Sequence, residues 1–483
     1  MRVKIEDFGP VSSFEFDSDK IFQLIIGDNN IGKSYVLSAY YFAIKSLLDL
    51  NALQWRYFQF AELLETGEGF FNEKSDADVD KTIKAKSGSK DLDITLFYKE
   101  CVRFAISQSF LNVFSEYIDG SYKEVGSVIN KMSSATKAKI TLTLSNKLQF
   151  TIAGDVGAFS VIDVNLGYKV VYRESKQNRD PVFQNNTFVI YKTAGTKEHA
   201  SKIRQRAVIQ TISNLLNGLN GFRDINYLPA SRSGLYQALS AFGQIIAELS
   251  KSRSFLSSKI ELPAIPRQLS DYFIKLTSIS EVSESTLPEL GAIADKIESL
   301  VLKGKIEYDF EEKRLYYRPQ GTDLRLDLSA TSSMVSEIGP IVVYIRHILG
   351  TIQPKRGNFG PRMVNTKAVT LKSILVIEEP EAHLHPDNQL KMTELYADLA
   401  KFGVHIVMTS HSNYVFNKVS NLIVGGTLLP EQVKCDLFEV TPQGSIGRVQ
   451  GIDNYGIDDN NFSDASEALL AEKLDLLGSQ KND

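Results

Sequence analysis

Eight residues near the N-terminus have the types and spacing of a phosphate-binding loop. Residues 27–34 read Gly-Asp-Asn-Asn-Ile-Gly-Lys-Ser and match the pattern G-x-x-x-x-G-K-[ST]. The glycines allow backbone N–H groups to turn inward around an anion. Lys33 would then reach the β- and γ-phosphates of a nucleotide, and Ser34 would bind Mg²⁺. We therefore predict nucleotide contacts from the loop and the residue after it: Gly27, Asn29, Asn30, Ile31, Gly32, Lys33, Ser34 and Tyr35.

Two adjacent carboxylates, Glu378 and Glu379, follow the aliphatic run at 374–377. In parallel α/β sheets, ligands bind at the carboxyl ends of the strands. We predict that Glu378 holds Mg²⁺, directly or through water, and that Glu379 polarises the attacking water as a catalytic residue. The alternative is a charged loop after a core strand. Two carboxylates make a poor end to such a strand, however, unless a cation compensates them.

Two further segments carry candidate phosphate ligands. His411 follows a third apolar run at 406–408, where it could contact a γ-phosphate. Hydroxyl residues at 329–333 open a predicted helix that continues towards residue 349, and the free N–H groups of a helix N-terminus attract anions. A serine-rich helix cap without a ligand is the alternative. We do not expect zinc, because no cysteine or carboxylate cluster completes a zinc site around the histidines.

Hydrophobic periodicity predicts the elements that position these residues. Three strands within 2–26 precede the loop, and a helix at 35–50 follows it. Period-two alternation over 139–191 predicts an inserted antiparallel sheet. The other expected elements are helices at 104–117, 197–216, 235–256, 266–280, 288–303, 387–401 and 463–477, strands at 224–228, 305–310, 314–318, 374–377, 405–408 and 435–441, and a solvated loop at 75–90.

The order of these motifs resembles that of ABC-type P-loop ATPases of the OLD, RecF and SMC lineage, over roughly residues 1–50 and 225–425. Most similar are the predicted AAA-family ATPases of bacterial defence and repair operons. They carry stretches like Tyr-Leu-Pro-Ala-Ser-Arg, here at 227–232, and Glu-Glu-Pro-Glu-Ala-His-Leu-His-Pro, here at 378–386. The resemblance implies an α/β fold, an ABC-type ATPase head with a mixed central sheet, an inserted antiparallel β-sheet lobe and a compact helical insertion. It also implies ATP and Mg²⁺ as cofactors and ATP hydrolysis as the activity.

The resemblance further implies a dimer in which the signature helix of one subunit caps the γ-phosphate bound to the other. Ser332 and Ser333 would act across that interface, and His385 would lie beside it. Arg232 stands in the position of a loop that senses nucleotide from the edge strand. The signature reads Ser-Ala-Thr-Ser-Ser-Met instead of Leu-Ser-Gly-Gly-Gln, so which serine contacts phosphate stays open, and Glu378 replaces the usual aspartate.

The resemblance also predicts how the chain divides. We expect residues 1–230 to form the N-terminal part of the head with the β-sheet lobe, and 231–304 the helical insertion. Residues 305–426 would complete the head, and 427–483 would form a strand and an acidic helical tail. OLD nucleases continue into a Toprim nuclease domain, for which the residues after Gly426 are too few. A long heptad coiled coil is also missing, so we expect no SMC arm.

Two functions follow as hypotheses. In the first, nucleotide-dependent formation of a homodimer or higher homo-oligomer regulates a separately encoded effector, a nuclease, in bacterial anti-phage defence. In the second, the dimer clamps duplex DNA like RecF. The second depends on two basic stretches: Lys192, Lys197, Lys202, Arg204 and Arg206, and Lys355, Arg356 and Arg362. Salt-dependent binding would distinguish the two.

The amino-acid composition limits the partners and protein classes that these hypotheses allow. The formal net charge of -4 gives no global basic signal, so a DNA surface would have to be local. Two cysteines and no apolar run of about 18 residues fit a cytoplasmic protein without a membrane partner. A transporter subunit is disfavoured because the sheet insertion and the signature differ, and a GTPase because no Asn-Lys-x-Asp motif occurs.

Overall fold

The computed structural model describes most of the chain as two compact units. The residues it describes are 1–52, 91–175, 179–193, 200–219, 221–238, 265–280, 287–349, 372–459, 469–474 and 476. The first unit comprises Met1–Asp17, Ser38–Gly221 and Pro442–Gly444, and the second comprises Ser18–Leu37, Phe222–Thr441 and Ser445–Asp483. All the candidate site residues belong to the second unit.

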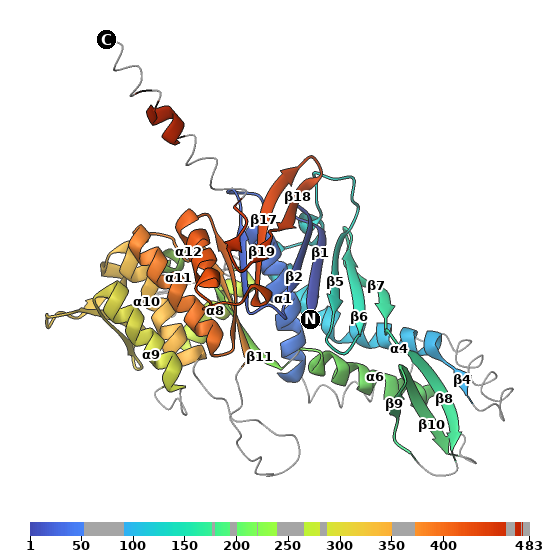
Figure 1. Ribbon diagram of the computed structural model, residues 1–483. Helices are drawn as coiled ribbons and strands as arrows, with labels where there is room; N and C mark the ends of the chain where they lie inside the picture. The colour runs from blue at the N-terminus through green and yellow to red at the C-terminus, as the bar shows by residue number, and fades with distance from the viewer. Residues whose placement is uncertain are drawn as a thin grey trace, which may run out of the picture. The chain divides into compact units, whose positions relative to one another are not determined.

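Parallel strands form the centre of the second unit (Figure 1). In sheet order, the described strands are β11 (Phe222–Leu228), β15 (Lys372–Glu378), β16 (Val404–Ser410), β3 (Phe22–Ile26) and β17 (Val433–Thr441), and β18 (Gly444–Val449) follows β17. Every residue of β3 and of β16 is buried. Strands buried on both faces have continuous apolar runs, which is why the sequence predicted β3, β15 and β16 clearly.

Helices cover one face of these strands, and one hydrophobic core joins them. Leu24, Leu375, Met408 and Cys435, from four neighbouring strands, all belong to this core. The helices that contribute to it are α8 (Arg267–Thr277), α9 (Pro288–Ile297), α10 (Ser333–Val343), α11 (Pro386–Lys401) and α12 (Asn413–Val424). The described helices of the predicted helical insertion therefore share their core with the strands that carry the site.

Short elements complete the second unit. The strands β12 (Gly304–Asp309), β13 (Arg314–Pro319) and β14 (Leu326–Asp327) form an antiparallel sheet, and β19 (Ile452–Asp453) pairs with β20 (Gly456–Ile457). Helices α9 and α10 continue as π-helical turns, η3 (Glu298–Leu302) and η5 (Tyr344–Leu349). Two 3₁₀ turns are η4 (Leu328–Ala330) and η6 (Pro430–Gln432).

The first unit contains two sheets. One has the order β2 (Val11–Asp17), β1 (Arg2–Phe8), β5 (Ala138–Thr143), β6 (Gln149–Gly154) and β7 (Phe159–Asn165), with antiparallel pairing throughout. The other has the order β4 (Leu92–Asp93), β8 (Lys169–Ser175), β10 (Thr187–Thr193) and β9 (Val182–Gln184). The described helical elements of the first unit are α4 (Thr95–Gln108), α5 (Phe110–Tyr122), η1 (Val125–Val128) and α6 (Ala200–Asn217). Helix α1 (Lys33–Ala52) begins in the second unit and continues into the first.

The predicted α/β fold with an inserted β-sheet lobe is present, but the strands within 139–191 belong to two sheets and are not all antiparallel. Strands β5 to β7 extend the antiparallel sheet of β1, whereas β8 and β10 lie in the other sheet and pair in parallel. Period-two alternation indicates only that one face of a strand is buried, and it does not encode the partner strand or its direction.

Several expectations fall partly or wholly outside the described residues. These are the loop at 75–90, most of the helix predicted at 235–256, the basic stretch at 355–362, and most of the helix predicted at 463–477. Among the helices that the structure describes, none has the length and apolar character needed to cross a bilayer.

Candidate functional site

The loop after β3 has the backbone of an anion-binding nest. Gly27 and Gly32 have φ of 139° and 102°, and Asn30 adopts a left-handed φ of 63°. A Cβ atom at Gly27 would lie 2.8 Å from Ile31 Cδ1 and 2.9 Å from Phe438 Cβ, so only glycine fits there. The N–H groups of Tyr35 and Val36 both bond to Gly32 O and begin α1. The predicted strand, glycine loop and helix are therefore present, and Asn29 and Ser34 are exposed at the loop.

Lys33 lies buried within this loop. Its Nζ donates to the carbonyl oxygens of Gly27 at 2.9 Å and Asp28 at 2.5 Å. Burial lowers the pKa of Lys33 to about 8, although the negative charges of Glu379, Asp28 and Glu381 oppose that shift. The ammonium is thus a poorly hydrated cation, which favours pairing with a phosphate.

Glu378 ends β15 beside Ser34 and fits a magnesium site. Its carboxylate accepts hydrogen bonds from the Ser34 and Tyr227 hydroxyls and from Ala230 N, while its buried Oε1 atom has no hydrogen-bond partner among the residues that the structure describes. Burial raises the pKa of Glu378, and the hydrogen bonds counteract part of that rise. An orphaned, buried carboxylate oxygen next to a serine hydroxyl suits Mg²⁺, which binds few protein ligands and keeps water and phosphate oxygens. Among the described residues, no group of three His, Cys, Asp or Glu could hold a different metal.

Glu379 and His411 meet at the ends of neighbouring strands. His411 Nε2 lies 3.5 Å from Glu379 Oε1, and both side chains are partly exposed. The hydrogen bond from His411 lowers the pKa of Glu379, and the charges of His411, Lys33 and Arg232 add to this effect. The backbone of Glu379 is left-handed, with φ of 44°, and its N–H donates to Thr409 O at 3.2 Å. The structure therefore brings together an ionised carboxylate, a histidine and the phosphate loop.

A third carboxylate, Glu381, was missed by the sequence analysis. Its Oε1 accepts hydrogen bonds from Ser410 Oγ at 2.8 Å and from His411 N at 2.7 Å. Its Oε2 is buried without a hydrogen-bond partner, and burial raises the pKa of Glu381. Glu381 thus joins the loop after β15 to the loop after β16. Its position two residues after Glu379 was the available signal.

Arg232, predicted to belong to a nucleotide-sensing loop after the edge strand, lies against the backbone of Glu378 and Glu379. Its side chain is fully buried in the interior of the second unit. The guanidinium donates to the carbonyl oxygens of Pro229 at 2.9 Å and Glu378 at 3.0 Å, and pairs with the Glu337 carboxylate at 3.1 Å. Arg232 is therefore a positioning residue. Glu337, also missed, was visible as the one charged residue in the mostly apolar helix α10.

The structure does not bring the remaining predicted residues to the phosphate loop of the same chain. Ser332 caps α10 by accepting from Val335 N, and Ser333 is the first residue of that helix. His385 caps α11 through Nδ1, which accepts from Asp387 N at 3.4 Å. All three are exposed, and in the described part of the chain none forms a hydrogen bond with residues 27–34. Asn388 Nδ2 lies 3.3 Å from Met334 Sδ, so the two helix starts are neighbours.

A comparison with protein families identifies the chain. The family model AAA_15, described as an AAA ATPase domain, matches residues 1–416. The chain belongs to this AAA ATPase family. The match includes the phosphate loop, both glutamates and His411, and it agrees with the resemblance seen in the sequence. No curated protein matches this AAA ATPase.

Solved structures similar to this AAA ATPase include heads of SMC proteins. The SMC head domain from Thermotoga maritima is 10% identical, with a TM-score of 0.35, over 93% of this chain and 98% of that one. An SMC head bound to the C-terminal winged-helix domain of ScpA has the same identity and coverage and a TM-score of 0.40. A head with an extended coiled coil, bound to the C-terminal domain of ScpA derived from Pyrococcus furiosus, is 10% identical over 98% of each chain, with a TM-score of 0.37.

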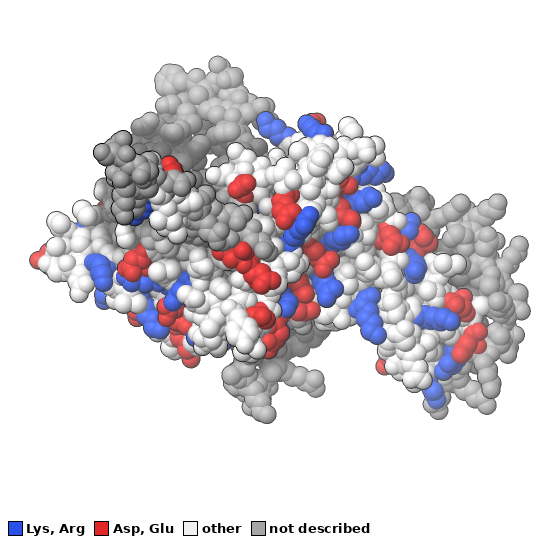
Figure 2. All heavy atoms as spheres, turned by 45° about the horizontal axis from the view of Figure 1, so that its top comes forward, with Lys and Arg blue, Asp and Glu red and all other residues white. Residues whose placement is uncertain are grey.

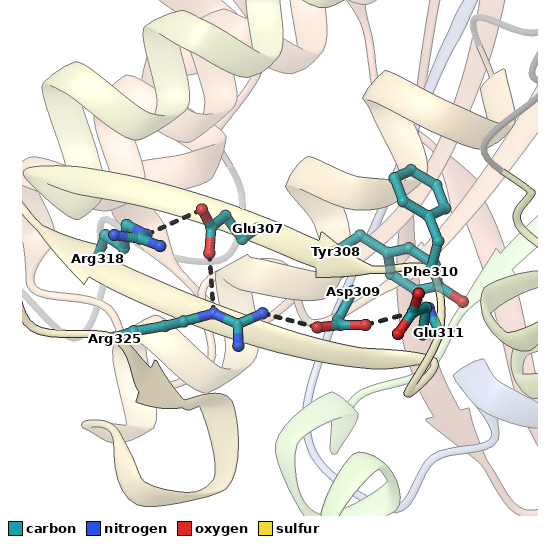
Figure 3. Close-up of a pocket in the computed structure, with 7 residues that line it drawn as sticks. All are labelled: Glu307, Tyr308, Asp309, Phe310, Glu311, Arg318 and Arg325. Atoms are coloured by element: carbon teal, nitrogen blue, oxygen red, sulfur yellow. Dashed lines mark hydrogen bonds and ion pairs between the residues drawn. The ribbon is translucent and has the colours of Figure 1, made fainter.

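A separate hollow of about 440 Å³ lies on β12 and β13 (Figure 3). Arg318 pairs with Glu307 at 2.8 Å, Glu307 with Arg325 at 3.0 Å, and Arg325 with Asp309 at 2.8 Å. Two guanidinium groups and two carboxylates of the hollow therefore neutralise each other, and Glu311 adds a third carboxylate to its lining. The candidate site residues lie instead at the carboxyl ends of β3, β15 and β16.

Proposed function

We propose that this chain binds ATP with Mg²⁺ and hydrolyses it. One observation supports this proposal most directly: His411 Nε2 lies 3.5 Å from Glu379 Oε1. The charge of Glu379 also acts on the Lys33 ammonium in the phosphate loop. A carboxylate whose pKa is lowered is ionised at neutral pH and can accept a hydrogen bond from a water molecule. Membership of the AAA ATPase family supports the same activity.

Each side chain has a specific task in this proposal. The N–H groups of residues 27–34 hold the triphosphate, and Lys33 balances the charge on its β- and γ-phosphates. Glu379 orients the attacking water, and His411 contacts the γ-phosphate and steadies Glu379. Ser34 and Glu378 hold Mg²⁺, which neutralises phosphate charge when bound.

We also propose that the active form is a dimer with two shared sites. The exposed residues Ser332, Ser333 and His385 support this, because they lie at the adjacent starts of α10 and α11 and form no bond to their own phosphate loop. An exposed helix N-terminus with free N–H groups suits the γ-phosphate held by a partner chain. A symmetric dimer would then place two nucleotides in one interface.

Closure of this dimer would regulate a separately encoded effector, a nuclease in anti-phage defence. This part of the proposal rests on the sequence resemblance. The DNA-clamping alternative gains no support from the face seen in Figure 2, where Lys and Arg are intermixed with Asp and Glu. Of its basic residues, only Lys192, Lys202, Arg204 and Arg206 lie in described elements, and the rest lie outside the described residues.

The test is steady-state ATP hydrolysis, with molar mass from light scattering with and without ATP and Mg²⁺. We expect Lys33→Ala to lose both nucleotide binding and activity. We expect Glu379→Gln to lose turnover by about a hundredfold or more while it accumulates as an ATP-bound dimer. The two variants are matched, since one removes binding and the other the chemical step. A wild-type chain without ATP hydrolysis, or a Lys33→Ala variant with unchanged activity, would contradict the proposal.

A further inference from the structure

A buried ion pair connects α10 to the backbone that carries the catalytic carboxylate. The side chains of Arg232 and Glu337 are 0% and 1% exposed, with Arg232 Nε 3.1 Å from Glu337 Oε2. Removing two charges from water costs several kcal/mol for each ion, and apolar residues of similar size often stabilise such a position equally well. Stability alone therefore does not account for this pair.

The planar guanidinium of Arg232 joins two elements at once. On one side, Nε donates to Glu337 O at 3.2 Å and faces the Glu337 carboxylate. On the other side, Nη1 donates to Glu378 O at 3.0 Å and Nη2 to Glu379 O at 3.5 Å. Because the fork of an arginine is rigid, a displacement of Glu337 shifts both carbonyl groups.

The position of Glu337 in α10 links this pair to the exposed start of the helix. Glu337 lies four residues after Ser333, so the two residues occupy the same side of α10. Glu337 also accepts hydrogen bonds from Ser233 N at 3.1 Å and Ser233 Oγ at 2.6 Å, which anchors it to the loop after β11. A movement of the start of α10 therefore reaches the loops after β11 and β15 together.

An aromatic shell makes this link stiff. Tyr272 and Tyr344 are stacked with ring centroids 5.5 Å apart, and both are buried, as is Tyr396. The charge of Arg232 acts on the Tyr272 and Tyr396 hydroxyl groups, so these rings lie near the ion pair. Because protein interiors are close-packed, we expect the ion pair to shift only together with the side chains packed around it.

We propose that Arg232 and Glu337 couple the two ATP sites of a dimer. This inference rests on the proposed function. When α10 docks on the nucleotide of the partner chain, the ion pair transmits the position of the helix to the Glu378–Glu379 backbone of its own chain, which serves the other nucleotide. Arg232 and Glu337 are thus positioning residues, and hydrolysis depends on ATP cooperatively, with a Hill coefficient between one and two.

The experiment uses the full chain with the double substitution Arg232→Met and Glu337→Gln. It leaves no unpaired buried charge, and the glutamine oxygen can still accept from Ser233. We expect kcat to fall by about 10- to 100-fold, the KM for ATP to stay within about threefold, and the Hill coefficient to fall to one. The matched control is Arg346→Met with Glu298→Gln, which removes another ion pair of the same unit at 2.9 Å without touching the catalytic backbone. This control should keep both the kcat and the Hill coefficient.

Thermal unfolding and ATP binding check that each variant is folded. If the double variant does not fold, Arg232→Lys replaces it, because lysine keeps the charge opposite Glu337 but lacks the fork that holds both carbonyl groups. A wild type that hydrolyses ATP without cooperativity, or a folded variant that keeps both kcat and Hill coefficient, would overturn this inference alone. A wild type that does not hydrolyse ATP would overturn the proposed function and the inference with it.

Discussion

At the scale of single residues, the backbone of Glu379 concentrates strain at the site. A non-glycine residue with φ of 44° carries a cost of about 1–3 kcal/mol. The surrounding bonds hold it there, since its N–H donates to Thr409 and its carbonyl accepts from Arg232. The strained turn directs the carboxylate towards His411 and away from the core, so the strain serves positioning.

The lowered pKa of Lys33 leads to a prediction about pH. Phosphate binding requires the ammonium form, so binding takes up a proton once the pH exceeds the free-state pKa of about 8. Affinity for ATP should therefore fall as the pH rises, by about tenfold between pH 7 and 9. Isothermal titration calorimetry in buffers of different ionisation enthalpy measures both the affinity and the proton uptake.

Lys33→Arg is the matched control for this effect, because a guanidinium stays charged over the whole range. Its affinity, although weaker, should not change with pH. Equal pH dependence in the wild type and in Lys33→Arg would assign the titration to another group.

The residues that the sequence predicted best are those whose chemistry is local. The loop at 27–34 and the pair Glu378 and Glu379 are recognisable because a short segment contains the whole pattern. Glu337 and Glu381 were not predicted, since their significance depends on distant partners. Glu337 accepts a hydrogen bond from Arg232, 105 residues away in the sequence, and Glu381 accepts one from His411, 30 residues away. The burial of Arg232 was invisible for the same reason.

At the scale of elements, the parallel strands were predictable and the sheet partners of the first unit were not. The strands β3, β15 and β16 are continuous apolar runs, and each ends in the polar residues that form the site. Their common direction brings these ends to one edge. By contrast, alternation in β8 and β10 did not reveal that they pair in parallel and leave the sheet of β5. Pairing is set by tertiary packing, which a local pattern does not encode.

The link between the loops after β15 and β16 can be tested through Glu381. Glu381→Ala would leave Ser410 Oγ and His411 N without their acceptor, so we expect the free energy of unfolding to fall by about 1–3 kcal/mol. The kcat for ATP should fall with it, since His411 loses its backbone anchor. Urea denaturation and steady-state hydrolysis measure the two effects. Glu381→Gln keeps an acceptor oxygen, and an alanine variant as stable and active as this control would contradict the assigned link.

At the scale of the whole molecule, the two groups of site residues suggest a division of labour between chains. Lys33, Glu378, Glu379 and His411 meet within one chain. Ser332, Ser333 and His385 lie exposed at neighbouring helix starts and contact no phosphate loop of their own. In a symmetric dimer, a complete site would then take its phosphate loop from one chain and its α10 serines from the other.

Mixing two inactive variants tests this division. Lys33→Ala disables the phosphate loop of its chain, and Ser333→Arg blocks the start of α10. A mixed dimer keeps one composite site, which limits an equal mixture to about a quarter of the wild-type hydrolysis rate. The chain that supplies the phosphate loop of this site has a blocked α10, so the proposed Arg232–Glu337 coupling lowers the expected recovery about 10- to 100-fold below that limit. A mixture of Lys33→Ala with Glu379→Gln is the control, because each change disables the nucleotide half of its own chain and no mixed dimer has an intact site. The deciding comparison is between the test mixture and the control mixture. A test mixture no more active than the control, although mixed dimers form, would contradict the shared site, and the exposed serines would then need a different ligand.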